Sequence, residues 1–425
     1  MRSTFLTLLA IVACILVLNR LVYDESPVPG HAELLAETNR FKKVVSSIAM
    51  VDSNFSDLQG LDSLFRNKRI LVLGEMRHDD GETFRAKARL IRWLHEQLDY
   101  QIVLYEAGQY DMWVMNREME TPTMLVPEIE RPGLGLFYFW WRTQENRPLM
   151  AYYQQSKRSA SPITLGGFDI QFSGGALRDQ RGQLLEAYCR KNKINLDSYP
   201  MFQQQLKRLD YLASALYADR QLDSSAKKQF LNELEGLEKA VQALAQDEQQ
   251  QVYAKYLADM RNNFKRTWQH APGSLSSMHI RDSLMAQNLC YQLDSLYAGK
   301  KVILWCANIH AFSAPYNKEY RPLGAYLKER YGEQAYMLGF SSYGRSADHG
   351  RLLDRPGKLA VENVFHATGS PYFLLDLQGL PDQSRFKQSF VSILNQQIAE
   401  DRKWSDFFDG IFYIDINKKP TYSEQ

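Results

Sequence analysis

Residues 69–105, RILVLGEMRHDDGETFRAKARLIRWLHEQLDYQIVLY, decide the fold. This stretch begins and ends with short apolar runs, RILVL at 69–73 and QIVLY at 101–105. Between them apolar residues recur at helical spacing, which predicts a helix over 84–98. Both runs are almost continuously apolar, which is typical of strands buried on both faces of a parallel sheet. A strand, a helix and a second parallel strand close naturally as a right-handed unit.

Similar apolar runs recur along the rest of the chain. They lie at residues 163–168, 301–306, 335–340, 372–377 and 411–416. Together these runs predict an α/β fold with a central, mostly parallel sheet flanked by helices. Residues 178–270 differ, because they are rich in Gln, Lys, Glu, Leu and Ala and carry leucines at helical spacing. We interpret this stretch as a helical insertion that forms a cap subdomain within an α/β domain at 36–425.

The N-terminal residues differ from the rest of the chain in their apolar composition. Residues 5–18 form an apolar run between Arg2 and Arg20, which fits the core of a signal peptide and is short for a membrane span. We therefore interpret residues 1–22 as a signal peptide or an N-terminal membrane anchor, with a buried helix as the alternative. Residues 23–35, with two prolines and a glycine, are expected to be a linker. This organisation predicts an exported protein of the cell envelope, periplasmic or membrane-anchored through its N-terminal segment.

Charge gives little indication of a macromolecular partner. The chain has 51 basic and 49 acidic residues, and its formal net charge is +2. Because the two signs are interleaved and no basic stripe stands out, nucleic acid is not an expected partner.

Acids and histidines follow four of the predicted strands. Glu75 and His78 come after the first strand, Glu106 after the second, Asp169 after the third and His310 after the fourth. In an open parallel sheet the carboxyl ends of the strands line the crevice where ligands bind. We therefore expect these side chains to converge on one polar site.

This mixture of residues suits hydrolysis. A histidine can take a proton from water near neutral pH, and a carboxylate behind it stabilises the imidazolium that forms. A second histidine or another basic group can stabilise the oxyanion of a tetrahedral intermediate. Glu75, His78, Glu106 and His310 supply this set, and no G-x-S-x-G motif offers a serine nucleophile instead.

A metal site is the main alternative. Glu75 and His78 are three residues apart and Glu82 lies near, so a metal could be held there. The chain has no H-E-x-x-H motif and no cluster rich in histidine. We therefore expect that no cofactor is required, while a divalent metal stays possible.

Several segments carry a family resemblance. The stretch LGEMRHDDGETFRAKARLIRWL at 73–94 resembles the opening motif of the erythromycin esterase family. The segments IVLYE at 102–106, GFDIQ at 167–171, RDSLMAQN at 281–288 and VILWCANIHA at 302–311 are similar to its later motifs, in the same order. The resemblance spans roughly residues 65–345.

The resemblance implies roles for individual residues. It makes His78 the general base that activates water, with Glu75 and Glu106 orienting it or binding that water, and it places His310 across the pocket. It also places Lys87 near the substrate, and it places Arg281 and Asp282 at the start of a second signature helix, where they brace the site or, for Arg281, bind substrate. Glu82 is a further candidate for substrate binding. For Lys87 and Arg281 the alternative is a solvated or salt-bridging helix face.

Two residues depart from the family pattern. The family more often has a small hydroxyl residue before the histidine and glycine after it, whereas this chain has Arg77 and Asp79. Hydrolysis of an ester is therefore a firmer expectation than hydrolysis of a macrolide in particular. The expected function is an exported or membrane-anchored hydrolase that cleaves a small-molecule ester or lactone. The alternatives are a haem- or metal-binding protein or a metal-dependent peptidase on the same scaffold, and an assembly role of the helical insertion in envelope polysaccharide production.

Overall fold

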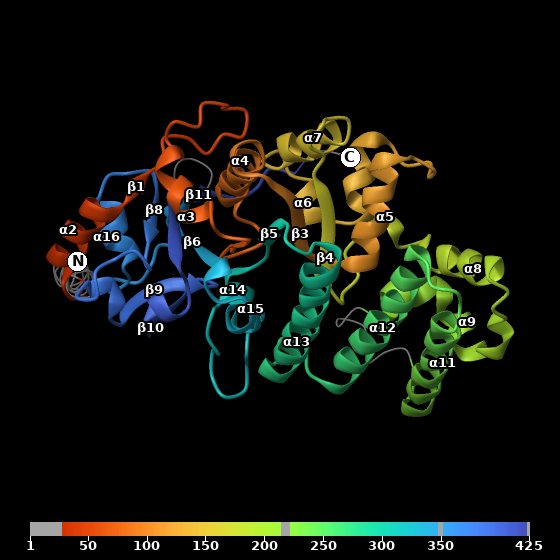
Figure 1. Ribbon diagram of the computed structural model, residues 1–425. Coiled ribbons are helices and arrows are strands. Elements are labelled where there is room, and N and C mark those ends of the chain that lie inside the picture. Colours follow the sequence, from red (N-terminus) through yellow and green to blue (C-terminus); the bar gives the residue numbers. More distant parts are fainter. Residues whose placement is uncertain (1–27, 214–221, 347–351, 423–425) are drawn as a thin grey trace, which may run out of the picture.

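The central element of the fold is a nine-stranded sheet. The computed structural model describes residues 28–213, 222–346 and 352–422 (Figure 1). The strand order is β1-β8-β11-β6-β2-β5-β3-β4, and β7 pairs with β6. The strands are β1 Lys43–Val44, β2 Ile70–Leu73, β3 Tyr100–Gly108, β4 Thr164–Asp169, β5 Lys301–Trp305, β6 Ala335–Ser346, β7 Leu352–Leu353, β8 Tyr372–Asp376 and β11 Gly410–Lys418. The six strands from β11 to β4 are parallel, whereas β8, β1 and β7 pair antiparallel with their neighbours. The predicted α/β class with a mostly parallel sheet is therefore confirmed.

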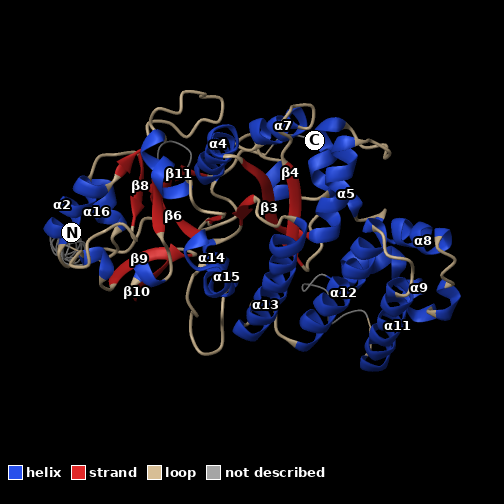
Figure 2. Cartoon of the chain, viewed as in Figure 1, coloured by secondary structure: helices blue, strands red, loops and turns tan. Residues whose placement is uncertain are grey.

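Helices cover both faces of the sheet (Figure 2). Those outside the predicted insertion are α2 His31–Phe41, α3 Asp62–Phe65, α4 Gly81–Leu98, α5 Gln109–Glu120, α6 Tyr138–Trp141, α7 Arg147–Ser156, α13 Leu275–Tyr291, α14 Asn308–Ala311, α15 Leu323–Tyr331 and α16 Glu362–Ala367. Helix α4 is the one predicted from residues 84–98. It connects β2 to β3, and β5 lies between these two strands in the sheet.

Alternate residues of the central strands pack into two separate cores. Leu71 and Ile303 belong to one core together with residues of α4, α5 and α7. Ile70 and Val302 belong to the other, which includes residues of α13 and α15. Because side chains alternate across a strand, burial of both sets explains why these strands read as continuous apolar runs.

The predicted insertion is helical, but it lies beside the sheet. Its helices are α8 Arg181–Lys191, α9 Pro200–Gln205, α10 Leu209–Ala213, α11 Ser224–Gln242 and α12 Glu248–Gln269. Figure 1 shows them grouped beyond β4, with α12 next to α13. Asn288 of α13 fixes this placement by donating to Phe168 O of β4 and to the Asp259 carboxylate of α12, at 3.1 and 3.4 Å. The expected cap over the sheet is therefore a group of helices packed against its β4 edge.

The predicted linker overlaps a helix. Helix α2 starts at His31, so residues 31–35 belong to the folded domain rather than to a tether. Leu34 is buried in the core, and the Glu37 carboxylate accepts a bond from Ser384 Oγ that ties the helix to the C-terminal half of the chain. The proposed leader at 1–22 lies outside the described residues.

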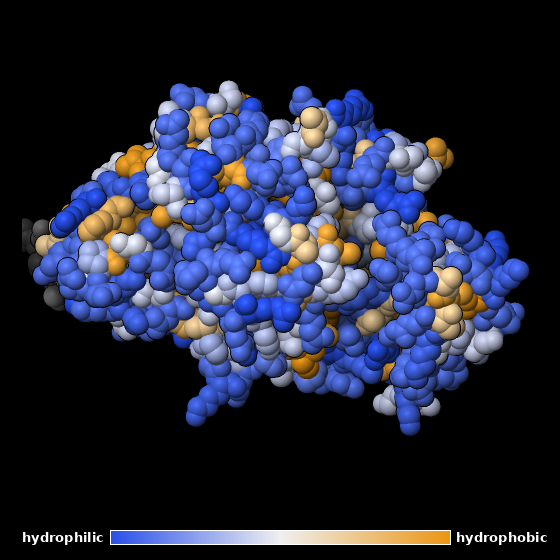
Figure 3. Space-filling view, in the orientation of Figure 1, coloured by the Kyte–Doolittle hydropathy of each residue, from blue (hydrophilic) through white to orange (hydrophobic). Residues whose placement is uncertain are grey.

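The described helices and the visible surface both carry many polar residues. Of the helices within 28–213, 222–346 and 352–422, none combines the length and the apolar character that a membrane span requires. On the face shown in Figure 3, hydrophilic residues predominate and hydrophobic ones form small scattered groups.

A hairpin that the sequence did not predict lies beside the sheet. Strands β9 Phe390–Asn395 and β10 Ile398–Arg402 pair antiparallel and are joined by Gln396 and Gln397. A Gln-Gln pair is not a usual turn sequence, and this explains why the hairpin was not recognised. The short strands β1 and β7, of two residues each, were also not predicted.

Candidate active site

The carboxyl ends of four parallel strands meet at one edge of the sheet. Glu75 and His78 follow β2, Glu106 lies near the end of β3, Asp169 ends β4, and His310 follows β5. The convergence expected from the sequence is therefore present. Gly74 allows the loop after β2 to approach α14 closely, because a Cβ at this position would collide with the Asn308 side chain.

The Glu75 carboxylate is completely buried and accepts four bonds. Its Oε1 is 2.7 Å from His78 Nδ1 and accepts a hydrogen bond from Trp140 Nε1 at 3.0 Å. Its Oε2 accepts from Lys87 Nζ at 2.7 Å and from Trp305 Nε1 at 2.8 Å. Burial acts to raise the pKa of Glu75, but the Lys87 ammonium and the contact with His78 outweigh it and hold the pKa below its ordinary value. Glu75 is therefore a fixed negative charge.

The His78 ring is held at one nitrogen and open at the other. Since Glu75 is ionised, it accepts the bond from Nδ1–H and leaves Nε2 unprotonated in the neutral ring. The ring stacks on Phe139 with centroids 4.9 Å apart and meets Trp140 edge-on. The side chain is 39% exposed, lines a cavity of about 480 Å³, and finds no partner for Nε2 among the described residues. An imidazole held in this way can accept a proton at Nε2 from a molecule in the cavity.

Electrostatics adjust the basicity of His78. Burial acts to lower the pKa of His78, but the hydrogen bond and charge of Glu75 outweigh it and raise the pKa above its ordinary value.

Asp80 is a second titratable group close to His78 in the chain. It is buried, and its Oδ2 has no hydrogen-bond partner in the described part of the molecule. Burial and the neighbouring Asp79 charge raise the pKa of Asp80 to about 7.

A second charged cluster surrounds Glu106. Its Oε1 accepts from Arg281 Nη2 at 2.8 Å and lies 3.2 Å from His310 Nε2, while its Oε2 accepts from the Ala307 backbone N–H at 2.9 Å. Arg281 also binds Asp169 with Nη2 at 2.5 Å. Ala307 lines the cavity that contains His78. The cluster therefore lies directly behind the wall of that cavity.

His310 carries a positive charge within this cluster. Its Nδ1 is 2.7 Å from Asp282 Oδ1, and its Nε2 faces Glu106. Burial acts to lower the pKa of His310, but Asp282 and Glu106 outweigh it and raise the pKa to about 10. Asp282 is itself fixed by Tyr320 Oη, which donates to its Oδ2 at 2.6 Å.

Four candidate residues do not make the contacts that were expected of them. Lys87 is fully buried beneath Glu75, so it forms a salt bridge and cannot reach a ligand. The Glu82 carboxylate lies 3.9 Å from Arg85 and from Lys418, so the structure does not bring it to His78. Arg281 is 16% exposed and is engaged by Asp169 and Glu106. Glu106 likewise contacts Arg281 and His310 rather than His78.

Aromatic residues of the site were missed by the sequence analysis. Trp140 and Trp305 fix the Glu75 carboxylate, and Phe139 supports the His78 ring. The aromatic run LFYFWW at 136–141 was the available signal, because aromatic side chains concentrated in one short segment often contact a buried site.

The donor groups are arranged for hydrogen bonding rather than for a metal. Within residues 28–213, 222–346 and 352–422, no group of three His, Cys, Asp or Glu side chains has positions suited to holding an ion. Both oxygens of Glu75 already accept from Lys87, His78 and the two tryptophans, so the carboxylate has no free lone pair aimed at the cavity. The alternative of a metal held by Glu75 and His78 therefore does not fit the donors of Glu75.

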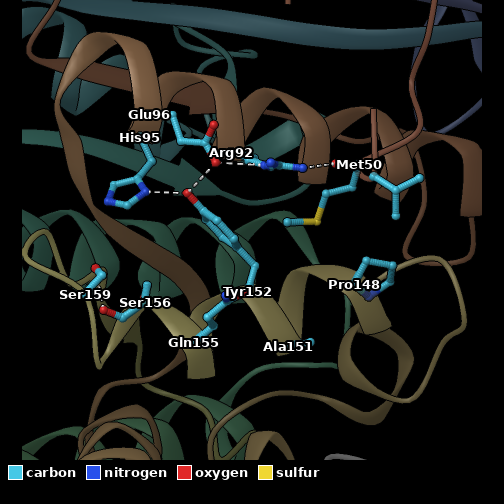
Figure 4. A pocket seen from close by; sticks show the side chains of 11 residues that line it. Met50, Arg92, His95, Glu96, Pro148, Ala151, Tyr152, Gln155, Ser156 and Ser159 are labelled. Atoms are coloured by element: carbon cyan, nitrogen blue, oxygen red, sulfur yellow. Dashed lines mark hydrogen bonds and ion pairs between the residues drawn. The ribbon is translucent and has the colours of Figure 1, made fainter. Parts of the chain in front are cut away.

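Another histidine lies in a cavity but lacks a free nitrogen. This cavity, of about 560 Å³, lies between α4 and α7 and contains His95 (Figure 4). His95 Nδ1 is 2.6 Å from Tyr152 Oη and its Nε2 is 3.0 Å from Ser161 O. Since both ring nitrogens are engaged, His95 offers no base comparable to that of His78.

Sequence comparisons match this chain to a family model and to known proteins. The family model described as erythromycin esterase matches residues 95–415, a range that includes Glu106, Arg281 and His310 but begins after Glu75 and His78. YbfO of Bacillus subtilis is 25% identical over 330 residues, covering 69% of this chain and 69% of its own length. Erythromycin esterase type II of Escherichia coli is 22% identical over 404 residues, covering 86% of this chain and 93% of its own.

Solved structures share the fold. A Bacillus cereus protein superposes with a TM-score of 0.74 at 16% identity, covering 93% of this chain and 99% of its own. A mutant of the erythromycin esterase EreC in its open conformation superposes with a TM-score of 0.63 at 16% identity, covering 91% of this chain and 100% of its own.

Proposed function

This chain belongs to the erythromycin esterase family and is a hydrolase that acts on esters, and from that premise we propose that it cleaves a small-molecule ester or lactone with a water molecule activated by His78. One observation carries the proposal. His78 Nδ1 is bound to a buried, ionised carboxylate, while Nε2 has no partner among the described residues and the side chain lines the cavity.

The chemistry follows from these positions. A water molecule at Nε2 gives its proton to His78 while its oxygen attacks the ester carbon. Glu75 stabilises the imidazolium that forms, since its charge lies at Nδ1. The imidazolium then returns the proton to the leaving alkoxide as the carbon–oxygen bond breaks, releasing an acid and an alcohol, or one hydroxy acid from a lactone.

Two cations behind the cavity wall, each paired with carboxylates, support the intermediate in this proposal. Arg281 and His310 lie behind Ala307, and the pKa of His310 is raised to about 10, so His310 is cationic at neutral pH. Charge arranged in advance in a buried site stabilises negative charge as it develops on the carbonyl oxygen. In this role Glu106 and Asp282 hold the two cations in place.

A substrate screen tests the function and its independence from metal. We expect the protein to hydrolyse esters or lactones but no short peptide, and a chelator to leave the rates unchanged, because the Glu75 oxygens are occupied by N–H donors. The screen measures turnover of all three substrate classes with and without the chelator. Peptide cleavage that the chelator stops would instead establish a metal-dependent peptidase, and a Soret band after addition of haemin would point to a haem-binding protein.

We also propose that the protein is exported or held at a membrane by residues 1–22. The apolar run between Arg2 and Arg20 supports this proposal. Cell fractionation of the full chain and of a variant without residues 1–22 tests it, and an unchanged distribution would contradict it.

A further inference from the structure

The tip of the β9–β10 hairpin has an unusual backbone. Gln396 and Gln397 have φ values of 50° and 66°, so two consecutive residues with long side chains adopt the left-handed region. A two-residue hairpin turn with both φ values positive normally uses Asn and Gly, which tolerate this region best. Backbone strain of this kind persists where the surrounding structure holds it, and it is concentrated at functional sites.

Two side chains from the active-site loops hold the hairpin. Arg77, next to the proposed base, donates from Nη1 to Gln397 Oε1 at 2.8 Å. Asn308, two residues before His310, donates from Nδ2 to Leu394 O at 2.9 Å. The position of the hairpin tip is therefore coupled to the loops that carry both histidines. This gives a structural role to Arg77, one of the two departures from the family pattern.

Gln396 is left with a free amide at the cavity. It is exposed, lines the same cavity as His78, and has no side-chain hydrogen bond to any described residue. A glutamine amide both donates and accepts, so it suits an uncharged polar group such as a hydroxyl.

The other cavity walls indicate the kind of ligand. Tyr138 and Tyr422 line the cavity with rings 5.9 Å apart, and they are 61% and 43% exposed. Aromatic faces of this kind bind the apolar face of a ring. The charged wall residues Arg77 and Asp79 bind each other at 2.9 Å, and Asp79 also accepts from Arg345 at 2.9 Å. Their charges are therefore already compensated and do not favour an ionised ligand.

We propose that the β9–β10 hairpin selects the substrate: Gln396 binds a hydroxyl of an uncharged, hydroxylated ring whose apolar face packs on Tyr138 and Tyr422. Arg77 and Gln397 are positioning residues that hold Gln396 at the cavity. The inference rests on the proposed function for the identity of the cavity as the ester site, but ligand binding tests it separately from turnover.

The test is an NMR titration of the full chain with three uncleavable probes. Methyl β-glucopyranoside supplies ring hydroxyls, cyclohexylmethanol lacks them, and methyl β-glucuronide adds a carboxylate. We expect the wild type to bind the glucoside about 10-fold more tightly than cyclohexylmethanol and at least as tightly as the glucuronide. Gln396→Ala should lower the preference for the glucoside over cyclohexylmethanol by about 3- to 10-fold, the range of one lost hydrogen bond.

Three further variants separate the contribution of the Gln396 side-chain amide from that of the turn conformation. Gln396→Gly removes the amide and also relieves the positive φ, so it should lose the same preference as Gln396→Ala. Arg77→Ala should reduce the preference partly, and Arg77→Lys should restore some of it by donating to Gln397. An unchanged preference in Gln396→Ala and Gln396→Gly, tighter binding of the glucuronide, or no binding of the glucoside would overturn the proposal. Failure of the proposed function would be seen differently, as no turnover of 6-O-acetylglucose or cyclohexylmethyl acetate by the wild type.

Discussion

The variant His78→Ala is expected to lose ester hydrolysis by roughly 10²- to 10⁴-fold in kcat, the usual contribution of a general base. The loss follows because Nε2 of His78 has no replacement: His310 is engaged by two carboxylates, and His95 has both ring nitrogens bound. The fold should persist, since the His78 side chain is 39% exposed and removing it leaves little empty space in the core. Steady-state rates, with circular dichroism to check folding, measure both expectations.

His366→Ala is the matched control for this variant. Its Nδ1 lies 2.7 Å from Asp415, the same separation as between His78 and Glu75, but His366 does not line the cavity that contains His78. We expect this control to keep wild-type turnover. Equal activity in His78→Ala and His366→Ala would show that His78 is not the base.

Lys87→Met is expected to reduce the free energy of unfolding by about 3–5 kcal/mol, because it breaks a buried ion pair and leaves one charge without its partner. Lys87 and Glu75 are both completely buried, with Nζ 2.7 Å from Oε2. The ammonium also lies 4.4 Å from the centre of the Trp305 ring, so several contacts are lost together. Urea denaturation of the wild type and the variant measures the difference.

Lys403→Met provides the comparison at the surface. Lys403 pairs with Asp406 at 2.8 Å, but its side chain is 50% exposed. Exposed pairs contribute little to stability, so this variant should unfold close to the wild type. Equal stability of Lys87→Met and Lys403→Met would show that the buried Lys87–Glu75 ion pair is not what stabilises the charge of Glu75.

Much of the fold could be predicted because burial on both faces leaves a strong pattern. The seven predicted strands correspond to β2, β3, β4, β5, β6, β8 and β11. The hairpin at 390–402 could not be predicted, because Gln396 and Gln397 adopt positive φ values in its turn and glutamine does not indicate such a turn. The position of the helical insertion could not be predicted either, because helix periodicity identifies an apolar face but not the surface that this face packs against.

The candidate site could likewise be predicted only in part. Strand ends indicated Glu75, His78, Glu106 and His310 because a parallel sheet gathers these positions at one edge. The pairing among them depends on side-chain geometry, so Lys87 was expected near the substrate although it lies beneath Glu75. Trp140 could not be assigned to Glu75 from the sequence, because the two are 65 residues apart and no periodic pattern relates the aromatic run at 136–141 to the end of β2.

The pH dependence of kcat/KM for an ester tests the central claim about His78 most directly. The base must be unprotonated, and Glu75 raises the pKa of His78, so activity should rise with pH through one ionisation above about 6.5. It should fall again near pH 10, where His310 loses its charge. Asp80 has a pKa raised to about 7, so Asp80→Asn is the control and should keep the rising limb. A rising limb centred near pH 4, or one that disappears in Asp80→Asn, would contradict the assignment of His78 as the base.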